Sequence, residues 1–217
     1  MTEQHHPHLV EPYTSLSEQR EAATLGMWIF LATELLLFGG LFLAYIVYRY
    51  TYPVTFHEMS GHLNIWIGTI NTVILLTSSL TMALAVHAIE HDRERPMLGY
   101  LAATASLGTV FLILKAYEYY EEWLHGLVPL IQFDFTFQAT QPIEPKLFMS
   151  LYFAMTGLHA FHLVVGILLI SGIAYFGWRG DYSAEYSNPV EIGGLYWHLI
   201  DIIWVFLYPL LYLLQPS

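Results

Sequence analysis

The sequence contains no cysteine and few charged residues. Of its 217 residues, 12% are charged and 56% are apolar, whereas an ordinary soluble domain is about 25% charged. Without cysteine, the chain can form no disulfide, zinc–thiolate site, iron–sulfur cluster or thiol nucleophile. Seven basic residues against 18 acidic ones argue against binding to nucleic acid. The shortage of charge indicates a polytopic membrane protein.

The beginning of the sequence lacks a basic head followed by an apolar run, so it does not resemble a secretory signal. We expect a polar tail over residues 1–24. Five apolar stretches follow, each near or above the roughly 20 residues that a helix needs to cross a bilayer. Prolines and charged residues separate them. The sequence therefore predicts an all-α membrane domain over residues 25–217, with spans at about 25–48, 63–89, 97–123, 147–176 and 193–214.

Basic residues near the spans predict the orientation of the chain. With five spans, the tail shares one side of the membrane with the second and fourth loops. That side carries four basic residues and the opposite side two, namely Arg20, Arg93, Arg95 and Arg179 against Arg49 and Lys146. We expect the N-terminus in the cytoplasm and the C-terminus outside. In the long outer loop, 126–146, the FDFTF segment is compatible with a short strand or with an aromatic patch at the interface.

Some ionisable residues fall at membrane depth, where they are costly and face protein or a cavity. Glu34 lies near the middle of the first span, and desolvation there favours its neutral form. Two interpretations remain open: a proton relay, or a protonated acid that bonds to a neighbouring helix. Lys115 and Glu118 lie three residues apart on one helix face and can pair. We expect the acids after them, Glu121 and Glu122, to be solvated.

Histidines mark the last two spans. His159 and His162 lie three residues apart in the fourth span, and His198 and Asp201 have the same spacing in the fifth. Within its helix, His198 is the expected partner of Asp201. The second span is rich in small hydroxyl residues, which are typical of close helix packing.

These ionisable groups are compatible with three functional classes. Histidines on facing helices could hold a b-type haem, with His87, His159, His162 and His198 as candidates. A mononuclear metal site could combine His159 and His162 with a carboxylate. A proton-coupled transporter could use Glu34 and Asp201, but the sequence lacks the internal repeat that such transporters show.

Four segments in fixed order are more specific than these patterns. GMWIFLATELLLFGGLF, NTVILLTSSLTMALA, MTGLHAFHLVVGI and YWHLIDIIWVFLYPLLY together resemble subunit III of the haem–copper terminal oxidases, over residues from about 25 to 212. The chain is most similar to the bacterial five-span form, which lacks the first two spans of the seven-span members. Quinol oxidases and some nitric oxide reductases have related subunits, and these remain alternatives.

The resemblance implies a non-redox subunit that carries no haem, copper or other metal of its own. It docks on the catalytic subunit I, which holds haem and copper, and it sustains proton uptake and turnover. The spans divide into two groups around a cleft that binds phospholipid. The complex transfers electrons from cytochrome c to oxygen and translocates protons across the bacterial inner membrane.

Particular residues match positions of the family pattern. The buried glutamate of the family falls on Glu34. Its histidine-bearing helix carries His159 and His162, and the signature of its last helix falls on Trp197, His198, Asp201 and Trp204. Arg179 and Glu191 match positions near the lipid headgroups, and a guanidinium suits a lipid phosphate well. The resemblance thus implies no catalytic residue on this chain.

Overall fold

The computed structural model describes residues 12–129, 132–133 and 143–213. Almost all of them are helical, and short turns join the first four helices. A minimal strand pair and one 3₁₀ turn (η1) complete the described part. In chain order the elements are α1 (Leu16–Thr51), α2 (Pro53–Ser60), α3 (Ile65–Glu90), α4 (Glu94–Leu124), β1 (Leu127–Val128), β2 (Gln132–Phe133), α5 (Ile143–Trp178), η1 (Ala184–Tyr186) and α6 (Asn188–Tyr212).

Five of these helices are long and apolar enough to cross a bilayer, namely α1, α3, α4, α5 and α6. This confirms the predicted all-α membrane architecture. The outward faces of the helices carry large apolar side chains, such as Leu36 (77% exposed) and Leu168 (67% exposed). Exposure of this kind is unfavourable in water and suits contact with lipid or with another subunit.

The helix boundaries differ from the predicted ones mainly near the start of the chain. Helix α1 begins at Leu16, so residues 16–24, which we assigned to the tail, are helical. The cause is local: the hydroxyl of Ser15 accepts a hydrogen bond from the Glu18 N–H (3.2 Å), and serine followed by glutamate three residues later is a helix-start signal. Helix α2 was not expected. Pro53, one of the prolines that separate the predicted spans, begins it, because proline is tolerated in a first helical turn.

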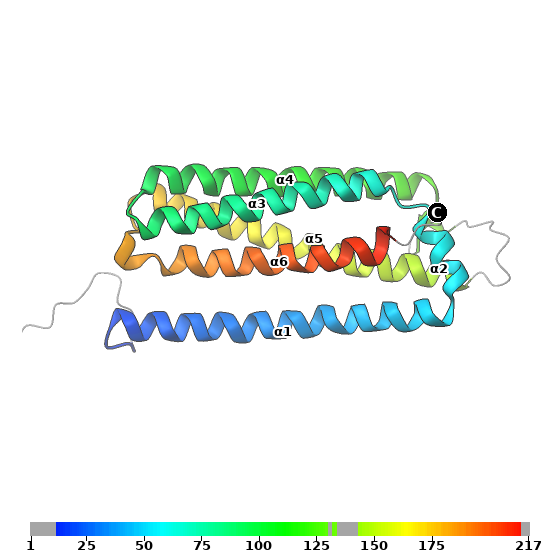
Figure 1. Cartoon of the computed structure of the whole chain (residues 1–217), viewed down its shortest axis with the longest axis horizontal. Helices are drawn as coiled ribbons and strands as arrows, with labels where there is room; N and C mark the ends of the chain where they lie inside the picture. Colours follow the sequence, from blue (N-terminus) through cyan, green and yellow to red (C-terminus); the bar gives the residue numbers. More distant parts are fainter. Residues whose placement is uncertain (1–11, 130–131, 134–142, 214–217) are drawn as a thin grey trace, which may run out of the picture.

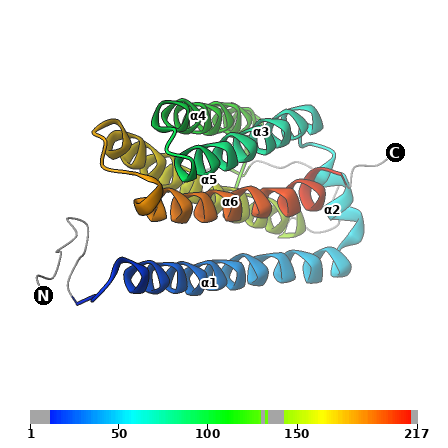
Figure 2. The ribbon, with the colours of Figure 1, turned by 60° about the vertical axis from the view of Figure 1, so that its left-hand side comes forward.

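The helices form two groups (Figures 1 and 2). Helices α3, α4, α5 and α6 pack as a four-helix bundle, and α1 lies alongside α6 and α5. The starts of α1 and α6 and the ends of α3 and α5 lie at one end of the molecule, here called the α1-start end. Helix α2 and the β1–β2 pair lie at the opposite end (Figure 1).

Two tryptophans of α6, Trp197 and Trp204, are fully buried at the centre of the bundle. Trp197 lies against Gly108 of α4, where a Cβ atom would come within 2.7 Å of the indole ring. Glycine therefore lets this pair of helices approach. Trp204 meets Phe111 edge-on, with ring centroids 4.7 Å apart.

Hydroxyl groups of α3 hold the polar ends of these rings. The indole N–H of Trp197 donates to the hydroxyl of Ser78, and that of Trp204 donates to the hydroxyl of Thr72, both at 3.1 Å. The packing role predicted for the hydroxyl-rich span is thereby confirmed. These bonds set the register between α3 and α6, because each buried indole N–H requires an acceptor.

The C-terminal end of α1 is held by aromatic packing. Tyr45 is fully buried and meets Phe56 of α2 and Phe148 of α5, with ring centroids 5.3 Å and 6.1 Å apart. In the loop that follows α4, β1 and β2 pair antiparallel, with Leu127 opposite Phe133. The rest of the FDFTF segment lies outside the described residues, so both interpretations of it stay predictions.

Candidate functional site

A polar contact joins the middle of α1 to the bundle. Oε2 of Glu34 lies 2.9 Å from Nε2 of His162 on α5. The side chains are largely buried, at 15% exposed for Glu34 and 11% for His162. Phe38, one turn further along α1, covers the imidazole edge-on at 5.5 Å. Two residues that the sequence placed separately at membrane depth are therefore direct partners.

The hydrogen bonds of His162 determine how many protons this pair holds. Its Nδ1 lies 2.8 Å from the carbonyl oxygen of Leu158, and because a carbonyl can only accept, Nδ1 must carry hydrogen. Nε2 then either accepts a hydrogen from a neutral Glu34 carboxyl or, as part of an imidazolium, donates one to the carboxylate. In both forms one proton lies between the two side chains. The pair is chemically able to hold and pass on a single proton.

A second polar contact lies at the α1-start end. A guanidinium nitrogen of Arg20 donates to both carboxylate oxygens of Glu191, at 2.9 and 2.7 Å. The hydroxyl of Ser187 donates to the same carboxylate at 2.6 Å. Glu191 is therefore already engaged by donors, whereas the Arg20 side chain is 53% exposed and keeps further N–H groups. Arg20 thus belongs to this end of the site, together with the predicted Glu191.

An apolar groove of about 310 Å³ lies between these contacts, where α1 and α6 face each other. Its lining is aliphatic and aromatic except for His198, and consists of Trp28, Leu31, Ala32, Leu35, Leu195, His198, Leu199 and Ile202. Trp28 also borders a hollow of about 520 Å³ that contains Arg20. The groove and the polar end are therefore adjacent. From Arg20 to Glu34 the helix rises about 21 Å.

The expected pairing of His198 with Asp201 is wrong. Nδ1 of His198 bonds instead to the hydroxyl of Ser79 on α3, at 2.8 Å. Asp201 is 4% exposed, and neither of its carboxylate oxygens makes a hydrogen bond of acceptable geometry with a described residue, although Ser79 is nearby. Residues three apart on a helix share a face only approximately, and here His198 turns toward α3.

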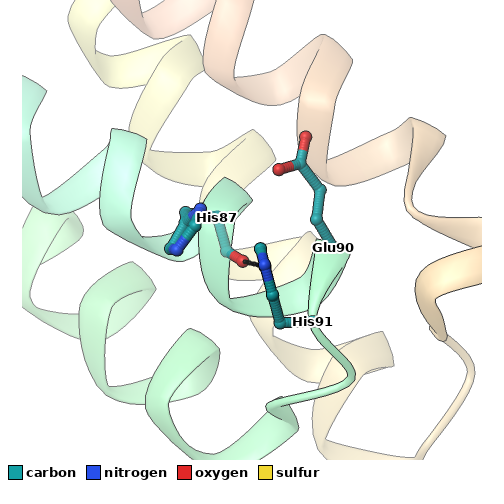
Figure 3. A group of neighbouring side chains, drawn as sticks. All are labelled: His87, Glu90 and His91. Carbon is teal, nitrogen blue, oxygen red and sulfur yellow. Dashed lines mark hydrogen bonds between the residues drawn. The ribbon is translucent and has the colours of Figure 1, made fainter.

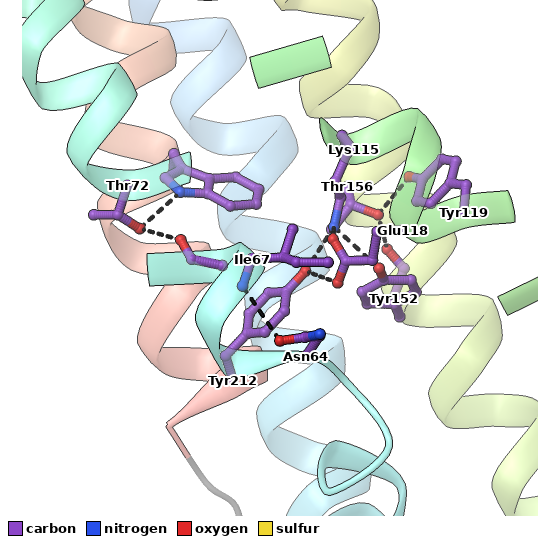
Figure 4. Close-up of polar contacts among 11 residues, drawn as sticks. Asn64, Ile67, Thr72, Lys115, Glu118, Tyr119, Tyr152, Thr156 and Tyr212 are labelled. Atoms are coloured by element: carbon purple, nitrogen blue, oxygen red, sulfur yellow. Dashed lines mark hydrogen bonds and ion pairs between the residues drawn. The ribbon is translucent and has the colours of Figure 1, made fainter. Parts of the chain in front are cut away.

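Lys115 and Glu118 form the ion pair that their spacing predicts, at 2.8 Å and with both side chains 2% exposed. The ammonium also donates to the hydroxyls of Tyr152 and Tyr212, at 3.0 and 2.6 Å. Tyr212 in turn donates to Glu118 at 2.6 Å (Figure 4). Tyrosine rings surround the ammonium as cation–π partners. This cluster connects α4, α5 and α6 within the bundle, away from the groove.

Glu122, expected to be solvated, is only 5% exposed. It lies one turn after Glu118 on the same face of α4, so the helix turns it inward with the buried pair. Glu121 faces outward and accepts a hydrogen bond from Tyr117 at 2.6 Å.

His159 lies apart from the Glu34–His162 pair. It is 1% exposed and packs between the rings of Phe111 and Trp204, at 5.6 and 5.1 Å. Neither ring nitrogen has a hydrogen-bond partner among the described residues. Its neighbours are aromatic, so its surroundings do not form a ligand set.

Arg179 is exposed just beyond the end of α5, and the end of α5 lies at the same end of the molecule as the start of α1 (Figure 1), where Arg20 lies. Sequence reasoning missed Arg20, Ser187 and Ser79 as site residues. For Arg20 a signal was present, because the helix-start pattern beginning at Ser15 places it on α1. For Ser187 a local signal was also present, because its partner Glu191 follows four residues later at the start of α6. For Ser79 no local signal exists, since its partner His198 is set by helix packing.

Comparison with known proteins agrees with the fold. Residues 17–215 match the family model of cytochrome c oxidase subunit III. The cytochrome c oxidase subunit 3 of Thermostichus vulcanus is 34% identical over 91% of this chain and 90% of the relative. That of Synechocystis is 31% identical over 87% and 74%. A heme-copper oxidase subunit I+III of Aeropyrum pernix is 29% identical over 86% of this chain and 22% of its own length.

Five helices long and apolar enough to cross a bilayer, with several buried polar side chains bonded between helices, define a helical membrane protein. The extent of these matches identifies it further: the chain belongs to the cytochrome c oxidase subunit III family. It is a non-redox subunit of a respiratory haem–copper oxidase, in which haem and copper belong to subunit I. The predicted resemblance is thereby confirmed, and the b-type haem anchor and the transporter are set aside.

Proposed function

We propose that this chain binds a phospholipid between α1 and the bundle, next to a proton-holding pair, and thereby supports proton uptake by the oxidase. The observation that carries the proposal is the groove between α1 and α6. Apart from His198 its lining is apolar, and it adjoins the hollow that Arg20 lines. An acyl chain suits the groove, and a headgroup phosphate suits the exposed guanidinium.

The contacts at the polar end of the groove suggest different roles for Glu191 and Arg179, the two predicted lipid-binding residues. Glu191 is occupied by Arg20 and Ser187, so it positions Arg20 instead of contacting the lipid itself. Arg179 lies exposed at the same end of the molecule and is the second candidate for a headgroup contact. A lipid held in this way would fill the space that α1 leaves beside α6 and would stiffen the contact between α1 and the bundle.

Lipid retention tests this proposal. In the purified oxidase complex, Ala32→Trp fills the groove and should reduce the tightly bound phospholipid measured by mass spectrometry. Arg20→Ala should reduce it as well. Leu36→Trp on the exposed face of α1 is the control for the first variant, and Arg93→Ala, in the turn between α3 and α4, is the control for the second. Equal lipid content in all four variants would contradict the proposal.

The Glu34–His162 pair supports a role in proton uptake, because it holds one proton at mid-membrane on the helix that borders the groove. We propose that the pair buffers the proton supply of subunit I during turnover. A purely structural contact would need the hydrogen bond but not the transferable proton.

We propose that subunit I is a direct partner of this chain. The name of the Aeropyrum pernix relative joins subunits I and III, which supports close contact between the two. The large exposed apolar faces of this chain offer surface for such a contact. The chain should co-isolate with a haem–copper subunit from mild detergent, and isolation of the intact chain without that subunit would oppose the assignment.

We further propose that the chain lies in a bacterial inner membrane with its N-terminus in the cytoplasm. The excess of basic residues on the α1-start side supports this orientation. The sequence contains no cysteine, so single cysteines can be introduced without background labelling. Thr14→Cys should react with an impermeant thiol reagent only after the membrane is opened, whereas His125→Cys should react in intact cells. The opposite pattern would reverse the orientation.

A further inference from the structure

Three side chains with metal-binding atoms converge at the end of α3. His87 and Glu90 lie in its last turn, and His91 follows directly (Figure 3). One ligand atom from each residue lies within 4.8 Å of the others, and all three residues are exposed. The group is separate from the Glu34–His162 pair and from the groove, and the oxidase role of the chain makes no use of it.

The local hydrogen bonds leave these ligands available. Nδ1 of His91 donates to the carbonyl oxygen of His87 at 2.9 Å, so Nε2 of the neutral ring keeps its lone pair. A backbone carbonyl that fixes the tautomer in this way is typical of histidine ligands. Within the described part of the chain, Glu90 forms no ion pair with the arginines that follow it, Arg93 and Arg95, although it precedes them closely.

The geometry is close to that of a bound ion. Ligands of a tetrahedral zinc ion lie about 3.3 Å apart, given bonds of about 2.0–2.1 Å. Exposed side chains can close the remaining distance by rotation alone. The imidazole rings of His87 and His91 are already adjacent, with centroids 4.3 Å apart. The partial negative charge at the C-terminus of α3 further favours a cation.

We propose that His87, Glu90 and His91 form a surface site for one divalent transition-metal ion. Two imidazoles and one carboxylate match the preferences of Zn²⁺ and Cu²⁺ and are poor ligands for Mg²⁺ or Ca²⁺. Water would fill the remaining coordination positions. The resemblance implied that the chain carries no metal of its own, and the proposed site departs from that expectation. The site is exposed and lies at a single helix end.

Calorimetric titration of the full-length chain in detergent with Zn²⁺ tests the site. His5, His6 and His8 near the N-terminus would bind zinc by themselves, so alanine replaces them in every variant. In this background we expect one bound ion. His87→Ala and His91→Ala should each weaken its affinity by about tenfold or more, and Glu90→Gln should weaken it less.

His125→Ala is the matched control. His125 also follows a helix end and also directs its Nδ1 to the carbonyl four residues earlier, at 2.7 Å, but it belongs to no group of three converging ligand side chains among the described residues. Its replacement should leave the affinity unchanged. Cu²⁺ spin resonance should report two imidazole nitrogens, and one after His87→Ala. No binding in the background chain would overturn the proposal, and so would an affinity in His87→Ala and His91→Ala equal to that of the background chain.

Discussion

Replacing Glu34 by glutamine or by alanine separates two roles of the contact between α1 and α5. A glutamine amide can donate to Nε2 of neutral His162, so the Gln variant keeps the hydrogen bond but loses the transferable proton. The Ala variant loses both. Helix α1 is also held at its two ends, by Arg20 and by the packing of Tyr45, so we expect both variants to assemble.

The structural cost of each variant follows from the burial of the pair. Glu34→Ala leaves Nε2 of His162, whose side chain is 11% exposed, without its partner. Losing the partner of a buried polar group costs about 1–3 kcal/mol. This corresponds to about a 5- to 150-fold change in the equilibrium constant between docked and undocked α1. Glu34→Gln should cost less than about 1 kcal/mol. Hydrogen exchange of α1 amides in the purified complex measures the difference.

Turnover decides whether the proton matters. We expect similar initial rates of oxygen reduction in both variants, followed by an equally early loss of activity and of proton pumping in reconstituted vesicles. Thr33→Val, adjacent on α1 and bonded only to its own helix, is the control and should sustain turnover. If Glu34→Gln sustained turnover like the parent while Glu34→Ala did not, the pair would be a structural contact and the reasoning about the proton would be refuted.

Three further predictions concern stability, measured as thermal unfolding in detergent. Lys115→Met should cost about 3–5 kcal/mol, because the Glu118 carboxylate stays buried without its cation; adding Glu118→Gln should restore most of the loss, and no restoration would contradict the pairing. Gly108→Ala should cost about 1–3 kcal/mol by overpacking a tryptophan ring, whereas Gly99→Ala, with open space around it, should be neutral or stabilising. Glu191→Gln should cost at most about 1 kcal/mol, because its partner is half exposed, and a larger loss would mean a more buried contact.

Contacts within one helix were only partly predictable. The pairing of Lys115 with Glu118 followed from spacing, and the structure contains it. The same spacing failed for His198 and Asp201, because the Ser79 hydroxyl of α3 offered His198 a better-placed partner. Spacing in the sequence indicates which side chains can meet on one helix. It does not indicate which polar groups of a neighbouring helix lie within their reach.

The sequence by itself determined that this is a membrane protein with five spans and, through four ordered segments, its family. Whether a helix can span the bilayer depends on the length of its own apolar stretch, which is a local property of the sequence. Only the tertiary structure decided that Glu34 pairs with His162, 128 residues away, and Arg20 with Glu191, 171 residues away. Only the packing showed the groove between α1 and α6. These features depend on which helix faces which and at what rotation, and that depends on the fit of all the helices together, as in the approach of Trp197 to Gly108.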